Sequence, residues 1–363
     1  MAATREDIIN ALKTVEDPEL FKDIVTLNMV KEVHICAGAV KVAVELTTPA
    51  CPLKENIRNS VTTAVMQVPG VASVEVNLSA KVRSMIEQKP ILPGVLNIIA
   101  VGAGKGGVGK STVAVNLAVG LALQGARVGL LDGDVYGPSI PTMTGLAIQN
   151  PSLRDEKIVP FEIGPAEHVI KVMSIGFIVP PEKALIWRGP MVHGVIKQFL
   201  EQVDWGDLDY LVVDLPPGTG DVSLTLAQSI PLTGAVIVAT PQEVALADAR
   251  RAVRMFQQLG VSILGVVENM SYFVCEHGSQ YDIFGRGGAR KMATTMGLPF
   301  LGELPIDMQI RKLSDNGDPF TNFSSAGPSQ KQLVSIVQTL AGQISVRNMT
   351  RPAGKPLKVD VTE

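Results

Sequence analysis

A short glycine-rich stretch carries the clearest chemistry in this sequence. The pattern G-x-x-x-x-G-K-[ST] is met within residues 104–112, which are Gly104, Lys105, Gly106, Gly107, Val108, Gly109, Lys110, Ser111 and Thr112. Glycines let backbone N–H groups turn toward a phosphate because no Cβ stands in the way. Lys110 has the position of the lysine that reaches the β- and γ-phosphates, and Ser111 that of the hydroxyl that ligates Mg²⁺. These residue types at this spacing predict a site for a nucleotide phosphate.

The segments on either side of this stretch support the same interpretation. An apolar run, residues 96–101, precedes it, and a helical pattern, residues 113–124, follows it. The N-terminus of such a helix adds a positive dipole where a phosphate would bind. The alternative is a chance glycine-rich turn, which the strand–loop–helix context disfavours.

Three aspartates follow predicted strands further along the chain. Asp132 and Asp134 flank Gly133, and Asp214 ends a very apolar run. Two carboxylates beside a polyphosphate are costly unless a cation lies between them. We therefore expect one of the first pair to orient a water for attack and the other to hold Mg²⁺ through water. Asp214 has the Walker B position, which contacts Mg²⁺; its alternative role is a helix cap or turn aspartate.

The order of apolar and amphipathic segments predicts the fold class. Strands alternating with helices indicate an α/β fold, a doubly wound, mostly parallel sheet, in which ligands lie at the carboxyl ends of the strands. The motif and the three aspartates fall at such ends. The expected strands are residues 97–102, 127–132, 210–214, 235–240, 263–268 and 299–303, and the expected helices are residues 111–124, 191–203, 223–228, 244–258, 289–296 and 330–346.

A smaller α+β domain is predicted ahead of this sheet, over residues 1–90. Its pattern is a helix starting near Thr4, strands at residues 29–36, 40–46 and 71–78, and a helix through about residue 68. Pro52 suits the first position of that helix, which would place the Cys51 thiol at a helix N-terminus. The dipole there favours the thiolate that binds metal or attacks. The alternative for Cys51 is a buried structural cysteine.

We expect residues 91–97 to be a linker, residues 98–345 to form the phosphate-binding domain and residues 346–363 to be a disordered tail, because the tail mixes proline, glycine and charge.

Composition narrows the classes of function. The formal net charge of −3 over 363 residues gives no sign of nucleic-acid binding. No stretch is long and apolar enough to span a bilayer, and acidic residues near the start argue against a signal peptide, so a cytoplasmic location is expected and no membrane partner. The three cysteines lie far apart in the sequence and imply no disulfide framework.

Lys105, a second lysine inside the glycine-rich stretch, has no role in elementary phosphate binding. With it, residues 104–111 resemble the deviant Walker A motif of the MinD/ParA and nitrogenase iron-protein class of ATPases. Within that class the chain resembles the Mrp/ApbC group of iron–sulfur cluster carriers. The segments that carry this likeness are residues 132–139, 187–191, 214–221 and 268–271. Residues 47–52 are similar to the characteristic motif of a small domain that is often fused ahead of these ATPases.

The resemblance implies a homodimer that sandwiches two ATP molecules. Lys105 would cross the interface to the phosphates of the partner, and Lys110 would act within its own subunit. Asp134 would position the hydrolytic water. Asn269 would read adenine, because a carboxamide can pair with both N6 and N7 of that base. The resemblance further implies Mg²⁺ as a cofactor, a cluster of the [4Fe–4S] type, and apo iron–sulfur proteins and cluster-assembly proteins as partners.

One departure from the family pattern concerns the cluster. Most of the family carries a C-x-x-C pair after the Asn-Met segment, and two such pairs give the four thiolates that a [4Fe–4S] cluster needs. Here Cys275 stands alone and Gly278 occupies the second position. His277 is either a substitute nitrogen ligand or an ordinary loop histidine. Cys51 is an alternative or additional cluster ligand.

Three other functions stay open at this point. A membrane- or DNA-bound positioning ATPase would need a basic amphipathic C-terminal helix, and residues 330–346 are not basic enough. A reductase like the nitrogenase iron protein would need two cluster cysteines per subunit. A nucleotide-switched scaffold without a cluster is the function that the missing cysteine most favours.

Overall fold

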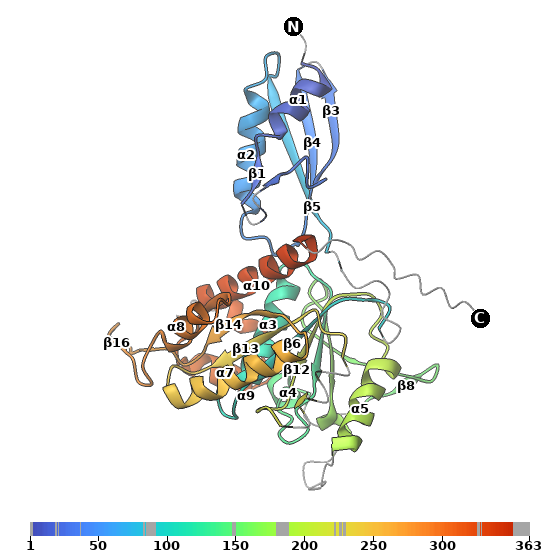
Figure 1. Cartoon of the computed structure of the whole chain (residues 1–363). Helices are drawn as coiled ribbons and strands as arrows, with labels where there is room; N and C mark the ends of the chain where they lie inside the picture. Colours follow the sequence, from blue (N-terminus) through green and yellow to red (C-terminus); the bar gives the residue numbers. More distant parts are fainter. Residues whose placement is uncertain are drawn as a thin grey trace, which may run out of the picture. The chain divides into compact units, whose positions relative to one another are not determined.

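The computed structural model divides into two compact units, one comprising residues 1–85 and 344–363 and the other residues 86–343 (Figure 1). The residues that the structure describes are 3–18, 20, 22–36, 38–82, 84, 92–146, 150–178, 189–220, 223–224, 227, 230–324, 327 and 329–350.

The first unit is built on a three-stranded sheet of order β3-β4-β5, comprising Val30–Cys36, Ala39–Leu46 and Ser73–Ala80. β3 and β4 form an antiparallel hairpin, and β5 lies parallel to β4. Every second residue of β4 is buried against two helices, α1 (Arg5–Leu12) and α2 (Lys54–Met66). This alternation is the period-2 signature of a half-buried strand, and it confirms the predicted small α+β fold. Two short strands, β1 (Glu16–Asp17) and β2 (Lys22–Asp23), pair beside it.

The second unit contains an eight-stranded sheet of order β10-β11-β7-β12-β6-β13-β14-β17. Six of its strands match the predicted ones and run parallel to their neighbours, so the predicted doubly wound fold class is confirmed. These six are β6 (Val95–Ala103), β7 (Val128–Asp132), β12 (Leu208–Asp214), β13 (Gly234–Ala239), β14 (Ile263–Glu268) and β17 (Phe300–Glu303).

Two further strands of this sheet were not predicted from the sequence. β11 (Ile170–Ser174) adds parallel to β7, and β10 (Phe161–Ile163) closes that edge antiparallel to β11. β10 is only three residues long, too short for a periodic pattern to reveal.

Helices cover both sides of this sheet (Figure 1). The helices that follow β6 in the described part of the chain are α3 (Lys110–Leu123), α4 (Ile140–Met143), α5 (Gly189–Gln202), α7 (Glu243–Gln258), α8 (Gly288–Thr295), α9 (Met308–Asp315) and α10 (Gln330–Thr350), of which α3, α7 and α8 pack on strands of this sheet. Short elements complete the described chain: β8 (Leu153–Arg154), β9 (Lys157–Ile158), β15 (Phe273–Val274), β16 (Gln280–Tyr281), and the 3₁₀ turns η1 (Ile175–Phe177) and η2 (Phe320–Phe323).

The last helix is longer than predicted. α10 extends to Thr350, so the predicted start of an irregular tail at residue 346 is wrong, while residues 351–363 lie outside the described part. Half of the helix predicted over residues 223–228, namely residues 225, 226 and 228, lies outside the described residues. No helix in the described ranges is both long and apolar enough to cross a membrane.

The core of the second unit lies around the central strands. In β6 every residue from Asn97 to Ala103 is buried, and β13 is buried throughout. A strand covered on both faces has no solvent side and therefore reads as a continuous apolar run. α7 contributes Phe256, whose ring lies against Gly102 so closely that a Cβ added there would be 3.0 Å from it.

Removing the Phe256 ring should therefore leave a cavity against the central strand. We expect Phe256→Ala to lower the free energy of unfolding by ~3–5 kcal/mol. Val244→Ala on the same helix is the matched control, because Val244 is 73 % exposed and its truncation should change stability by no more than ~0.5 kcal/mol. Urea titration followed by circular dichroism measures both. Similar losses in the two variants would contradict this placement of the core.

Candidate functional site

The glycine-rich loop joins the end of β6 to the start of α3. Gly107 and Gly109 have φ of +79° and +81°, and Gly109 is the residue that precedes the helix. A Cβ on Gly109 would lie 2.1 Å from Asn269 Nδ2, and one on Gly104 would lie 2.1 Å from the carbonyl carbon of Asp248 in α7. Glycine is therefore required at both ends of the motif by close approach of other segments, besides any demand of a phosphate.

Lys110 is the charge around which the site is arranged. It is the first residue of α3 and is buried. Its Nζ lies 2.6 Å from Asp214 Oδ1 and 3.3 Å from Asp134 Oδ2. Asp214 ends β12 and Asp132 ends the neighbouring β7, and the two are direct register partners. The parallel sheet thus places the predicted carboxylates side by side at one edge.

Burial raises the pKa values of these carboxyl groups. The pKa of Asp132 is raised to about 8 by desolvation and by the neighbouring Asp214. Asp132 is held by the Ser174 hydroxyl at 2.9 Å and by the backbone N–H of Asp134 at 3.1 Å. Burial also raises the pKa of Asp214, against the opposing attraction of Lys110. Charge on this pair is costly in the absence of a further cation.

The donor set fits a divalent cation. Asp214 Oδ2 is buried and accepts no hydrogen bond from the described residues, and the Ser111 hydroxyl lies 3.3 Å from Lys110 Nζ. Within the described ranges, no three His, Cys, Asp or Glu side chains form a ready metal-binding group. Mg²⁺ typically takes one or two carboxylates and completes its shell with phosphates and water, so an open arrangement of this kind suits it.

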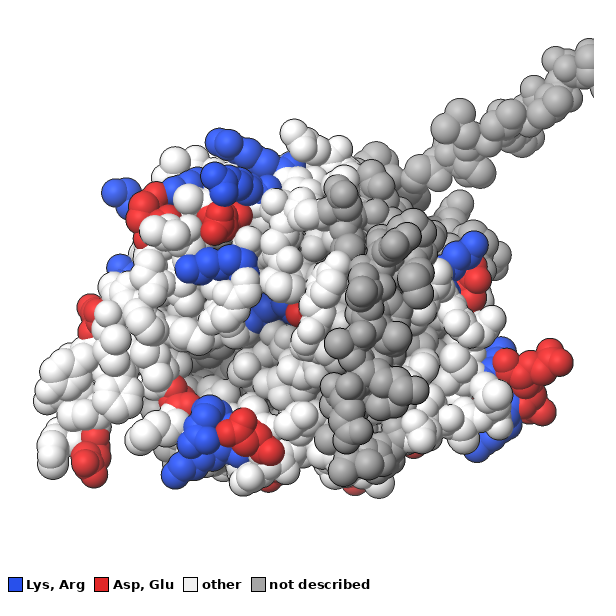
Figure 2. Space-filling view, turned by 90° about the horizontal axis from the view of Figure 1, so that it is seen from below, with Lys and Arg blue, Asp and Glu red and all other residues white. Residues whose placement is uncertain are grey.

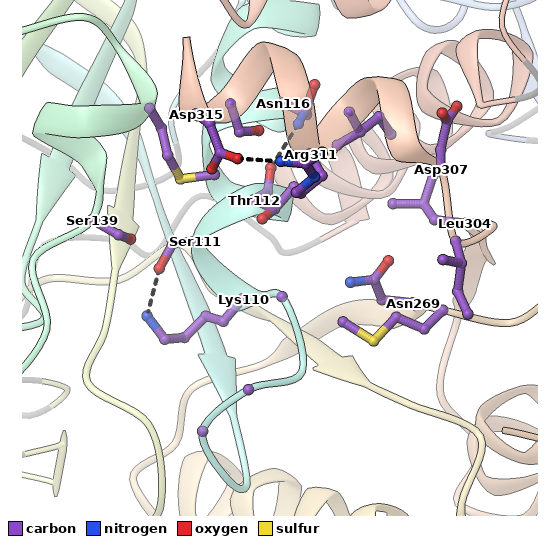
Figure 3. A pocket seen from close by; sticks show the side chains of 18 of the residues that line it. Lys110, Ser111, Thr112, Asn116, Ser139, Asn269, Leu304, Asp307, Arg311 and Asp315 are labelled. Atoms are coloured by element: carbon purple, nitrogen blue, oxygen red, sulfur yellow. Dashed lines mark hydrogen bonds and ion pairs between the residues drawn. The ribbon is translucent and has the colours of Figure 1, made fainter. Parts of the chain in front are cut away.

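A cavity of about 980 Å³ opens beside the loop. Its size is at the upper end of typical small-molecule pockets. Figure 3 shows Lys110 and Ser111 on one side and Asn269 and Leu304 on the other. The labelled lining residues are Lys110, Ser111, Thr112, Asn116, Ser139, Asn269, Leu304, Asp307, Arg311 and Asp315.

The structure brings most of the sequence-predicted residues to this one cavity. Lys105, Asp134 and Asn269 line it together with residues of the loop. Asp132 and Asp214 are fully buried and lie behind Lys110 instead of on the cavity wall. Lys105 is only partly exposed and has no ion-pair partner in the described part of the chain.

Asn269 is fixed against the loop. It follows β14, is buried, and donates from Nδ2 to the Val108 carbonyl oxygen at 2.9 Å. Because its amide also lies against Gly109, Asn269 and the loop hold each other in place across 160 residues of sequence.

The wall formed by residues 304–307 and α9 was missed from the sequence. Asp307 caps α9 by accepting from Gln309 N at 2.8 Å, and Arg311 pairs with Asp315 at 2.8 Å on the same helix. The available signal was Asp307 itself, a capping residue shortly after a strand whose carboxyl end lies at the ligand-binding edge.

Cys275 lies in the second unit, in the turn between β15 and β16. Its N–H donates to the Ser279 carbonyl at 3.0 Å, and Gly278 N–H donates back to the Cys275 carbonyl at 2.9 Å. The backbone N–H of His277 lowers the pKa of the Cys275 thiol. Gly278 has a φ of +80°, and a Cβ added there would meet no atom within 4 Å.

Cys51 lies in the first unit, and its predicted setting needs correction. Leu53 precedes α2 as its cap and the helix begins at Lys54. Pro52 is therefore outside the helix, and the Cys51 thiol is further from the first helical N–H groups than the sequence suggested. Cys51 is partly exposed.

Figure 2 shows the molecule from below the view of Figure 1, with a hollow near the centre of this face. Around the hollow most of the surface carries neither basic nor acidic side chains, and where these occur they lie beside one another in small mixed groups. Large apolar side chains are exposed along the loops that border the cavity, including Tyr136 at 63 %, Ile283 at 56 % and Phe284 at 40 %.

Two family models match the chain. Residues 94–341 match the ParA family, described as NUBPL iron-transfer P-loop NTPase, and residues 5–78 match a family described as iron–sulfur cluster assembly protein. The two matches fall on the two units of the structure.

Individual relatives agree with these matches. The chain is 50 % identical to the iron–sulfur cluster carrier protein of Deinococcus radiodurans, over 94 % of this chain and 96 % of that protein. It is 38 % identical to the carrier protein of Escherichia coli, over 95 % and 92 % of the two chains. Among solved structures it resembles a nucleotide-binding protein in complex with ADP from Archaeoglobus fulgidus, with a TM-score of 0.58 and 42 % identity over 68 % of this chain and 96 % of that one. The cell division ATPase MinD of Pyrococcus furiosus shares the fold, with a TM-score of 0.51 and 23 % identity over 67 % and 97 %.

The close approach of Asn269 to the loop can be tested with two alanine variants. In Gly107→Ala the added Cβ meets no atom within 4 Å. The free energy of unfolding should therefore fall only by the strain of a left-handed residue, ~1–2 kcal/mol. Gly109→Ala carries the same strain and must also displace the Asn269 amide from the Val108 carbonyl. We expect its free energy of unfolding, measured by urea titration without nucleotide, to be lower than that of Gly107→Ala by a further ~1–3 kcal/mol. Equal losses would contradict the contact.

Proposed function

This chain belongs to the ParA family of NUBPL-type iron-transfer P-loop NTPases, and from that premise we propose that it hydrolyses ATP in the cytoplasm and carries an iron–sulfur cluster to apoproteins. The observation that carries the ATPase half is the contact of Lys110 with Asp214 and Asp134 beneath the phosphate-binding loop. The carrier half is supported by the two family matches and by relatives that bear this name.

Lys110 serves as a counter-ion that nucleotide binding would release. Without ligand its ammonium offsets the charge of two buried carboxylates. Mg²⁺, when bound near Ser111, Asp132 and Asp214, would supply positive charge to the β- and γ-phosphates and to these carboxylates. Lys110 would then be free to turn toward the phosphates, as its place in the motif requires.

Asp134 and Asn269 supply the other two functions that ATP hydrolysis needs. Asp134 is nearly buried and lines the cavity, where its carboxylate would hold a water for attack on the γ-phosphate. Asn269 uses one N–H on Val108. Its carbonyl oxygen and second N–H are the groups that would pair with N6 and N7 of adenine.

Lys105 and the apolar loops around the cavity support a homodimer. Lys105 is a cation at the cavity without a partner among the described residues, which suits a lysine that contacts the nucleotide of the other subunit. Tyr136, Ile283 and Phe284 offer apolar area around the same opening. Two copies facing each other through this surface would bury that area and enclose both nucleotides.

The cluster is cargo, and we assign Cys275 as its first ligand. The described residues of one chain contain no group of three or more His, Cys, Asp and Glu side chains that could hold a metal ion, which suits a cluster bound between two subunits. The lowered pKa of Cys275 favours the thiolate that iron binds. Two subunits supply only two thiolates there; His277, beside Cys275, is the candidate further ligand at this site, and Cys51 in the first unit is an alternative or additional ligand.

The second candidate function is a nucleotide-switched dimeric scaffold that carries no cluster. Gly278 favours it, because this residue stands where a second thiolate would be expected. Apo iron–sulfur proteins and cluster-assembly proteins would remain its partners, but as clients that it holds together.

Replacing Lys110 should stop ATP turnover. We expect Lys110→Ala to lower kcat by at least ~100-fold, because a positioned charge on the transferring phosphate is lost. Lys197→Ala, on the exposed face of α5, is the control and should turn over ATP at the wild-type rate. Phosphate release measures both rates, and circular dichroism checks that the buried carboxylates left by Lys110→Ala do not unfold the chain. Turnover retained in a folded Lys110→Ala would contradict the assignment of the loop.

Anaerobic reconstitution with iron and sulfide separates the carrier from the scaffold. We expect a brown protein whose iron and sulfide content falls to background in Cys275→Ser and is unchanged in Cys36→Ser, where the thiol is exposed at the end of β3. Loss in Cys51→Ser as well would assign that residue to the same cluster. A wild type that stays colourless would exclude the carrier and favour the scaffold.

A further inference from the structure

Glu268, the last residue of β14, is a fully buried carboxylate that the proposed chemistry does not use. It accepts hydrogen bonds from three donors: the Ser271 hydroxyl, Gly287 N–H at 2.7 Å and Ala289 N–H at 2.6 Å. Two of these are N–H groups at the start of α8, where the helix dipole also favours a negative charge. A buried carboxylate with three donors is well satisfied, and removing it would leave those donors unpaired.

These donors lie on either side of segment 272–286, which contains the β15–β16 hairpin. Ser271 comes just before the β15–β16 hairpin, which carries Cys275, and Gly287 comes just after it. The Glu268 carboxylate therefore closes the segment 272–286 at its base. A second contact reinforces the closure: Arg286 pairs with Glu303 and lies 4.5 Å from the centre of the Tyr272 ring.

Both ends of this excursion are also attached to the wall of the cavity. On the incoming side, Ser271 N–H donates to the Leu304 carbonyl at 2.9 Å, and Ile306 N–H donates to the Tyr272 carbonyl at 2.6 Å. On the outgoing side, Ile283 and Phe284 line the cavity together with Leu304 and Ile306. Figure 3 shows Leu304 and Asn269 on the same side of the opening.

Met270, between Asn269 and Ser271, has a φ of +55°. A long side chain rarely adopts this left-handed conformation, which costs of order 1 kcal/mol and persists only when the surroundings determine it. Here the Asn269 amide is held by the loop and Ser271 is held by Glu268. Met270 therefore connects Asn269, which is proposed to contact adenine, directly to Ser271, which Glu268 holds at the base of the hairpin.

From these contacts we propose that Glu268 is a positioning residue that couples occupancy of the cavity to the hairpin carrying Cys275. The inference rests on the proposed function, since it takes the ligand of the cavity to be a nucleotide. A nucleotide that contacts Asn269 and the 304–307 wall restrains both ends of segment 272–286. The Glu268 carboxylate passes this restraint to the backbone of the hairpin, because it bonds to both ends at once.

Amide hydrogen exchange in residues 273–281 of the full-length protein tests the coupling, with ADP as the probe. We expect saturating ADP to slow exchange in this segment about fivefold or more in the wild type, at the lower end of usual coupling between sites. Glu268→Gln should lose this slowing, because its amide N–H₂ faces donors that need an acceptor. The matched control is Glu243→Gln, at an exposed glutamate that starts α7, which should behave as the wild type does.

Binding of a fluorescent ADP analogue, measured on the same samples, separates the possible failures. We expect Glu268→Gln to bind it within about tenfold of the wild type, because the phosphate-binding loop is intact. Saturable binding with no change of exchange in the wild-type hairpin, or with full slowing in Glu268→Gln, overturns the coupling and leaves the proposed function standing. Absence of any binding by the wild type overturns both. If Glu268→Gln does not fold, Ser271→Ala decides: it removes one donor and should reduce the ADP effect, and an undiminished effect overturns the proposal.

Discussion

The site depends on the free-energy cost of burying two carboxylates next to each other at the carboxyl end of the parallel sheet. Asp132 and Asp214 are fully buried register partners on neighbouring strands, and the pKa of Asp132 rises to about 8 in consequence. Such a pair is relieved either by protonation of one carboxyl group, as the raised pKa of Asp132 indicates, or by a compensating positive charge. Lys110 supplies part of it, 2.6 Å from Asp214, and one carboxylate oxygen of Asp214 still lacks a hydrogen-bond donor among the described residues. The unliganded site is thus unsatisfied in a way that a cation and a polyphosphate would correct.

The order of the parallel strands brings these charged groups together. β6, which leads into the glycine-rich loop, lies beside β12, and β12 lies beside β7. Because all three run parallel, Asp214 and Asp132 end neighbouring strands as register partners, and Lys110, at the start of the helix after β6, contacts Asp214 although the two are far apart in sequence. The helix that begins at Lys110 is almost entirely buried, so the ammonium is delivered from a rigid element and cannot easily move away into solvent.

Features of this fold that have a local sequence pattern could be predicted, and features that depend on tertiary contacts could not. The loop, the aspartates and the six parallel strands have local patterns, and they were found. β10 was missed because it is too short to show a period. The wall beside α9 was missed because its one signal, the capping residue Asp307, is a single residue and not a motif. The predicted helical position of Pro52 was wrong because Pro suits both the first helical turn and the turn just before it. The contact of Asn269 with Gly109 belongs to the tertiary fold, and no sequence pattern reports it.

The conformation of the turn at Cys275 limits how many thiols it can present to a cluster. Gly278 is left-handed, at φ +80°, and donates its N–H to the Cys275 carbonyl. A cysteine at this position would find room for its Cβ but would have to adopt a conformation that costs an L-residue ~1–2 kcal/mol. Glycine therefore allows a tight, hydrogen-bonded turn without strain, whereas a cysteine at position 278 would keep the same turn only at that cost. If a cluster binds here, this turn supplies one thiolate and no second one, so its remaining ligands must be His277 or residues outside the turn.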